Sequence, residues 1–202
     1  MARNMALKRA AKANRRKAVV AEKRKSDLVE GSLAMQAVRA AQMPIQHCLM
    51  SGRLFETGIG TLVIARGATS YNLAVGVFLV DTWSLGVRDA LLRPLDAETF
   101  EDVLASMEEP GPADHIDPAY ARKLLRDVAA WAASNGFAPH RDFAAVEKLF
   151  GDVDAGACDA TFAFGHEGRV TYVSGPGESR ALIAHRTRLA GEAQEKQEAA
   201  QI

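Results

Sequence analysis

The feature that most constrains the fold of this chain is the stretch YNLAVGVFLVD at residues 71–81. From Val75 to Val80 it is apolar apart from Gly76, as expected of a central strand that is buried on both faces. The β-rich segment TLVIAR occupies residues 61–66, and the four residues GATS join it to the apolar stretch. Two such strands separated by so short a turn predict an antiparallel hairpin.

Two other segments also have strand patterns. IQHCLM at 45–50 is short and apolar, and a glycine-containing turn follows it. Residues 161–173, TFAFGHEGRVTYV, alternate large apolar side chains with small or polar ones on either side of His166-Glu167-Gly168. This alternation predicts a second hairpin.

Helical patterns fill most of the remaining body. The clearest helix begins with Asp117 as N-cap and Pro118 as its first residue, and Asn135-Gly136 ends it. Further helices are expected at 84–93, 96–109 and 142–150 and from about Ser179, with a surface loop at 110–115. Because no βαβ unit recurs, the sequence predicts an α+β fold, in which helices pack on an antiparallel sheet of four or five strands.

The zero net charge of the protein conceals a strong separation of charge along the chain. Ten of the first 25 residues are Lys or Arg and only Glu22 is acidic, so this segment carries +9 and the remainder −9. We therefore predict a basic arm at residues 1–25 that is helical or folds on binding. A docked helix (26–43), an α+β globular domain (44–190) and a polar tail (191–202) are expected to follow.

The basic arm is the main functional signal in the sequence. Neutralising a line of phosphates releases counterions, so a dense basic segment binds nucleic acid strongly and with little sequence preference. The arm has no aromatic side chain to stack on bases, which favours phosphate contacts to structured RNA. An acidic protein, an acidic lipid surface or solubility alone are the other interpretations. The predicted RNA-binding residues are Arg3, Lys8, Arg9, Lys12, Arg15, Arg16, Lys17, Lys23, Arg24 and Lys25.

Three segments of the body, GVFLVDTWSLGVRDA, GFAPHRDF and GRVTYVSGPGES, resemble an uncharacterised bacterial family of hypothetical proteins. Its members have similar Val-Asp-x-x-x-Leu-Gly-Val and Gly-Phe-x-Pro-His segments, often behind a Lys/Arg-rich start. The resemblance covers about residues 44–185. It implies a shared fold but no catalytic residue, because no activity is attached to that family.

An enzyme is the first alternative, most plausibly a hydrolase or nuclease with Asp81 near its active site. A rigid strand can aim a carboxylate into a cleft, and Asp81 stands where the central strand ends. This alternative requires Asp81, Asp89 and His140 to converge in one pocket. The interpretation that we favour is that Asp81 caps the following turn, because aspartate side chains commonly accept hydrogen bonds from backbone N–H groups two or three residues on.

Other candidate chemistry in the sequence has simpler explanations. Cys48, His140 and Asp142 could form a nucleophilic set only if the fold brought them together, and a cysteine in an apolar strand is usually inert. The scattered histidines and two distant cysteines match no zinc-ligand spacing. The glycine-rich loop SGPGES at 174–179 lacks the P-loop pattern, so a helix cap near Glu178 or Ser179 is favoured over a phosphate site.

Taken together, these features predict a non-enzymatic RNA-binding accessory protein of the cytoplasm without metal or cofactor. No apolar run approaches the length of a membrane span, and two isolated cysteines are typical of a reducing compartment. The basic arm would attach the protein to a ribonucleoprotein such as the ribosome, while its acidic body stays free for a protein partner. A protein–protein interaction module whose arm binds an acidic partner is the second alternative.

Overall fold

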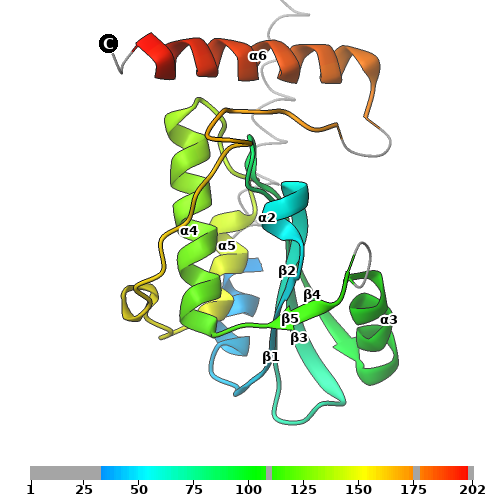
Figure 1. The fold of residues 1–202 in the computed structure, drawn as a ribbon. Coiled ribbons are helices and arrows are strands. Elements are labelled where there is room, and N and C mark those ends of the chain that lie inside the picture. The colour runs from blue at the N-terminus through cyan, green and yellow to red at the C-terminus, as the bar shows by residue number, and fades with distance from the viewer. Residues whose placement is uncertain (1–32, 108–110, 175–177, 200–202) are drawn as a thin grey trace, which may run out of the picture.

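Five antiparallel strands form one sheet in the order β4-β3-β2-β1-β5 (Figure 1). The structure, a computed structural model, describes residues 33–107, 111–174 and 178–199. The strands are β1 (Ile45–Ser51), β2 (Ile59–Arg66), β3 (Asn72–Asp81), β4 (Gly86–Asp96) and β5 (Ala113–His115). β2 pairs with β3 along its whole length, so the hairpin predicted at the centre of the sheet is confirmed. The α+β class is confirmed as well.

Helices cover both faces of this sheet. On one face lie α4 (Pro118–Ser134), α5 (Phe143–Val146), the 3₁₀ helix η1 (Glu147–Phe150) and a helical segment at residues 33–40. On the other face α3 (Ala97–Met107) packs Phe100 and Met107 against β2 and β3 (Figure 1). The central strand β3 is therefore covered on both sides, because Phe78 contacts the rings of Phe143 and Phe150 while Val75 faces α3.

The expected helix at 84–93 is wrong, because most of this segment belongs to β4. Its Leu, Ala and Arg residues favour a helix locally, but the turn at 82–85 returns the chain along β3. Gly86 permits that return: its φ is +70°, and a Cβ there would lie 2.7 Å from the Cβ of Ala132. Pairing with β3 therefore overrides helix propensity. As an edge strand, β4 also tolerates Pro94.

The expected hairpin at 161–173 is also wrong. The only β-bridge within this segment joins His166 to Arg169 and is isolated from the sheet. Phe162 and Phe164 instead pack against Tyr120 and Trp131 of α4, so their alternation reflects contact with a helix. The loop expected at 110–115 contains the short strand β5, which pairs with β1.

The helix signals were more reliable than the strand signals. Asp117 caps α4, since its Oδ1 accepts hydrogen bonds from the N–H groups of Ala119 and Tyr120. The helix expected at 142–150 is divided between α5 and η1, and α2 (Leu54–Thr57) and η2 (Ala155–Ala157) are single turns. The last helix, α6 (Arg180–Ala199), continues through much of the expected polar tail. Ala190 and Ala193 are buried near Val170, and the Val170 N–H donates to Gln194 Oε1 at 3.0 Å.

A buried arginine ties together elements on one face of the sheet. Arg66, at the end of β2, is 5% exposed and donates to the carbonyl oxygens of Ala41, Met43 and Phe150 at 2.6–2.9 Å. Two of these carbonyls follow the helical segment at 33–40, and the third ends η1. Burial lowers the pKa of Arg66. The guanidinium therefore satisfies the carbonyl groups at two helix ends that have no partner within the helices.

Candidate functional site

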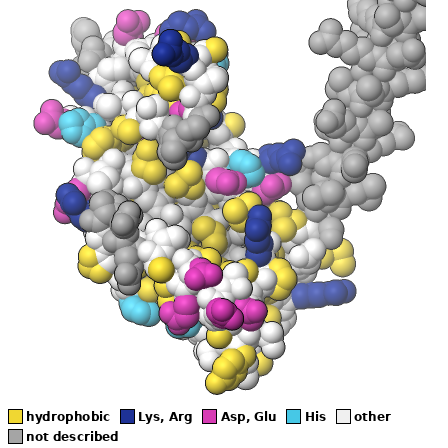
Figure 2. Space-filling model, turned by 90° about the vertical axis from the view of Figure 1, so that its right-hand side faces the viewer, with side chains coloured by type: hydrophobic (Ala, Val, Ile, Leu, Met, Phe, Trp, Pro, Cys, Tyr) yellow, Lys and Arg dark blue, Asp and Glu magenta, His cyan; other side chains and the backbone are white. Residues whose placement is uncertain are grey.

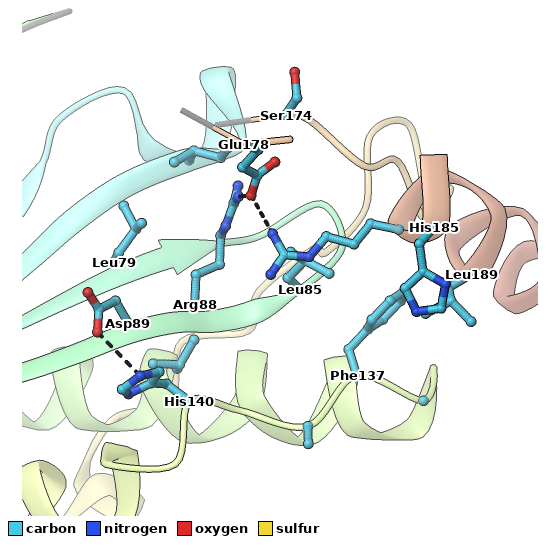
Figure 3. Close-up of a pocket in the computed structure, with 15 residues that line it drawn as sticks. Leu79, Leu85, Arg88, Asp89, Phe137, His140, Ser174, Glu178, His185 and Leu189 are labelled. Carbon is cyan, nitrogen blue, oxygen red and sulfur yellow. Dashed lines mark hydrogen bonds and ion pairs between the residues drawn. The ribbon is translucent and has the colours of Figure 1, made fainter. Parts of the chain in front are cut away.

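A cleft of about 850 Å³ lies between the first residues of β4, the loop after α4 and the helix α6 (Figure 3). Its apolar lining includes side chains from the sheet, that loop and α6. Its polar lining has both charge signs. The apolar side chains are Ile59, Leu79, Leu85, Val87, Phe137, Ala138 and Leu189, and the polar ones are Arg88, Asp89, His140, Ser174, Glu178, His185 and Arg186.

A β-bulge places the polar residues of β4 in the cleft. Leu79 pairs with Asp89 and Val80 pairs with Val87, so Arg88 is an extra residue opposite the β3 register. A bulge of this kind re-aims side chains and is common at the edges of sheets. Here both Arg88 and Asp89 line the cleft, while Val87 is also packed into the core.

Buried ion pairs fill one side of the cleft. Arg88, whose side chain is 8% exposed, donates to Glu178 Oε1 at 2.6 Å and lies 3.7 Å from Asp81 Oδ2. Arg186 of α6 and the Tyr172 hydroxyl also donate to Glu178. Burial and the bond to Glu178 raise the pKa of Tyr172. This network fastens the start of α6 to β4.

Asp89 and His140 form a looser pair at another side of the cleft (Figure 3). Asp89 Oδ1 lies 3.6 Å from His140 Nε2, and it accepts a hydrogen bond from the N–H of Ala90. His140 Nδ1 accepts a long hydrogen bond of 3.4 Å from the N–H of Asp142. The Asp89 side chain is 45% exposed, so it can reach a molecule in the cleft.

Asp81 caps the turn after β3, as the favoured interpretation predicted. Its Oδ1 accepts hydrogen bonds from the N–H groups of Trp83 and Ser84, and its Oδ2 accepts one from Ser84 Oγ. Burial raises the pKa of Asp81, although these hydrogen bonds and Arg88 oppose the shift. Asp81 is fully buried and does not line the cleft. The convergence with Asp89 and His140 that an Asp81-centred enzyme requires is therefore not met.

The capping role predicts a graded response to substitution of Asp81. Asp81→Ala removes an acceptor from the buried Ser84 N–H, the partly buried Trp83 N–H and Arg88, which is expected to cost about 3 kcal/mol of unfolding free energy. Asp81→Asn should recover most of this loss, because the amide oxygen can still accept both backbone hydrogen bonds. Urea unfolding followed by circular dichroism measures both values.

The matched control is Asp154→Ala, because Asp154 Oδ1 caps η2 in an exposed turn by accepting from the N–H of Gly156. Loss of an exposed cap is expected to cost about 1 kcal/mol or less. Equal losses at the two sites would contradict the structural role given to Asp81.

The other sequence candidates do not assemble into a catalytic set. Cys48 is buried in the core, where burial raises its pKa to about 12, and it does not line the cleft that contains His140. Cys158 is a free thiol as well. Within the described ranges, no three His, Cys, Asp or Glu residues are grouped closely enough to hold a metal ion.

The loop at 174–179 contributes to the cleft and also begins α6. Ser174 and Glu178 line the cleft, while residues 175–177 lie outside the described part of the chain. Ser179 Oγ accepts a hydrogen bond of 3.3 Å from the N–H of Leu182. The cap predicted at this position is thus confirmed.

The predicted RNA-binding residues of the arm, Arg3 to Lys25, all lie outside the described residues. In the described body many basic side chains are held in ion pairs. The acids of α3 are exposed, and acidic side chains gather on the face that Figure 2 shows. Those acids are Glu98, Glu101 and Asp102. The paired basic residues are Arg53, Arg88, Arg122, Lys123, Arg126, Arg141, Arg186 and Arg188.

Sequence reasoning missed the cleft, including the roles of Arg88, His185 and Arg186. The sequence feature that points to the cleft is the arginine between apolar residues in SLGVRDALLR. An expected helix over this segment gives that arginine no reason to face a cleft. The three segments that carry the family resemblance all contribute lining residues, represented by Val87, Phe137 and Glu178.

Models of known families, curated proteins and solved structures were all compared with the chain, and none matches it. The family resemblance therefore stays a prediction. None of the helices in the described residues has the length and apolar character needed to cross a membrane.

Proposed function

We propose that this protein is a non-enzymatic, cytoplasmic RNA-binding accessory protein that holds structured RNA through its basic arm, residues 1–25. The observation that carries the proposal is the separation of charge between this arm and the rest of the chain, +9 against −9. A phosphate backbone attracts the arm and repels the body. Binding is therefore expected to depend on the arm.

The charge arrangement of the described body supports binding of RNA by the arm rather than by the body. Arg122 and Arg126 share Glu147, and Arg186 pairs with Glu178, so each of these cations already has a carboxylate partner within the protein. Arg66 is buried among carbonyl oxygens. Phosphates would have to displace existing partners to bind these side chains, whereas the arm has one acid among ten bases.

The type of RNA follows from the composition of the arm. Arginine can bind phosphate through two parallel hydrogen bonds and lysine acts as a point charge, but neither requires an unpaired base. A large folded RNA offers many closely spaced phosphates, and the ribosome is the most abundant example. The acidic surface, including α3, then remains available for a protein partner.

The experiment is co-purification of nucleic acid with the full-length protein and with a variant lacking residues 2–25. Lysate is prepared at low salt and divided among untreated, RNase-treated and DNase-treated samples. Retention of RNase-sensitive nucleic acid by the full-length chain alone is expected, and sequencing identifies that RNA. Equal retention by both chains would contradict the proposal. Retention of lipid or an acidic protein after RNase treatment would instead favour the interpretation of the arm as a general polyanion anchor.

A further inference from the structure

We propose that the cleft beneath α6 binds an organic cation, a protonated amine attached to an apolar group, through the carboxylate of Asp89. This site is separate from the RNA-binding arm, and its chemistry does not depend on the proposed function. The inference rests on the size and lining of the cleft, on the neutralisation of all its other full charges, and on the open acceptor positions of one carboxylate.

The cleft has the size and lining of a small-molecule site. Its volume of about 850 Å³ lies within the range of roughly 300–1,000 Å³ that is typical of ligand pockets. Leu79, Val87 and Leu189 provide apolar surface from three different elements. An apolar group of a few carbon atoms would displace water from these side chains, which favours binding.

The buried ion pairs of the cleft neutralise one another. Arg88 lies between Asp81 and Glu178, and Arg186 also pairs with Glu178. Two guanidinium groups are thus matched by two carboxylates. Both Glu178 oxygens already accept hydrogen bonds, one from the arginines and the other from Tyr172.

Asp89 supplies the full charge in the cleft that this network leaves uncompensated. The nearest polar side-chain atom given by the structure, His140 Nε2, is 3.6 Å from Asp89 Oδ1, beyond hydrogen-bonding distance. Because His140 Nδ1 accepts from the Asp142 N–H, the neutral form of the ring has its hydrogen on Nε2, and that form brings no charge to Asp89.

The carboxylate of Asp89 retains capacity for a ligand. A carboxylate has about four acceptor positions. Among the described contacts of Asp89, one of these positions accepts a hydrogen bond from the N–H of Ala90. An ammonium group offers three donors for the open acceptor positions of Asp89 and a full positive charge to match its negative charge. An anion would be repelled by Asp89, and a neutral alcohol would leave the charge unmatched.

Two sources can supply this chemistry: a free amine, and the side chain of a lysine or arginine from the protein's own arm. The experiment separates them by comparing the wild-type chain with a full-length chain in which Lys8, Arg9, Lys12, Arg15, Arg16 and Lys17 are glutamine. If arm side chains occupy the cleft, a free amine should bind the substituted chain more tightly than the wild-type chain, because it no longer competes with those side chains. If the ligand is a free molecule, the affinities of the two chains are equal.

The test uses 2-phenylethylamine as the probe, with 2-phenylethanol and phenylacetate as neutral and anionic controls of similar size. Binding is followed by NMR titration of isotope-labelled full-length protein. We expect saturable binding of the amine, with shifts at cleft residues such as Leu79 and Leu189. Asp89→Asn should weaken binding about tenfold or more, as expected for a lost hydrogen bond to a charged group.

Glu101→Gln is the matched variant, because it removes one exposed carboxylate from α3, outside the cleft. It should leave amine binding unchanged. A second substitution in the cleft, Leu79→Trp, fills it without changing its charge and should abolish binding. The proposal is overturned if the alcohol or the acid binds both chains as well as the amine does, or if Asp89→Asn and Glu101→Gln have equal effects. Absence of saturable amine binding to both chains would also overturn it.

Discussion

Glutamine substitution of six arm residues is expected to weaken RNA binding by about 1,000-fold or more at about 0.1 M salt. Each lost phosphate contact removes a released counterion, and the losses multiply in the binding constant. Fluorescence anisotropy with a labelled structured RNA measures the change. The substituted residues are Lys8, Arg9, Lys12, Arg15, Arg16 and Lys17.

A matched variant removes the same number of positive charges from the body. Its six sites are exposed, so the substitutions leave the core intact. If RNA binding depended only on net charge, the two variants would lose affinity equally, a result that would contradict the role given to the arm. We expect the body variant to lose less than about tenfold. Its substituted residues are Arg93, Arg141, Lys148, Arg169, Arg180 and Lys196.

Arg66→Met is expected to lower the unfolding free energy by about 4 kcal/mol, the largest stability effect of any single substitution considered for this fold. Methionine matches the apolar stem of arginine but cannot donate to the carbonyl groups of Ala41, Met43 and Phe150. The carbonyls of Ala41 and Met43 lose this donor, and that of Phe150 keeps only the hydrogen bond of 3.3 Å from the Val153 N–H. The loss should also loosen the junction between the helical segment at 33–40 and η1.

Urea unfolding gives the stability, and hydrogen exchange shows where it is lost. Arg93→Met provides the control, because Arg93 is exposed on the edge strand β4 and should lose less than about 0.5 kcal/mol. Comparable losses at positions 66 and 93 would refute the claim that Arg66 ties the helix ends to the sheet.

The strands that could be predicted from the sequence are those whose environment leaves a local pattern. β3 is buried on both faces, so its apolar run is continuous, and a short turn to β2 fixes the pairing. β4 is half-exposed and contains helix-favouring residues, so only its contact with β3 makes it a strand. Conversely, Phe162 and Phe164 alternate with small residues, a pattern that is typical of a strand, yet both side chains pack on α4.

The candidate cleft was beyond sequence reasoning because its lining residues are far apart in the chain. Asp89 and His140 were recognised as candidates, but their pairing depends on how the loop after α4 meets β4. Glu178 was expected near a helix cap, and its contacts with Arg88 and Arg186 required the position of α6. Asp81 was correctly interpreted because its hydrogen bonds are local, two and three residues along the chain.

The measurement that tests the central claim most directly is the salt dependence of RNA affinity for the full-length chain. If the arm neutralises six to ten phosphates, a plot of log K against log salt concentration should fall with a slope between about −4 and −9, depending on the RNA's strandedness. The six-glutamine variant should give a much shallower line. A flat line for the full-length chain, or the same slope for both proteins, would contradict binding of RNA phosphates by residues 1–25.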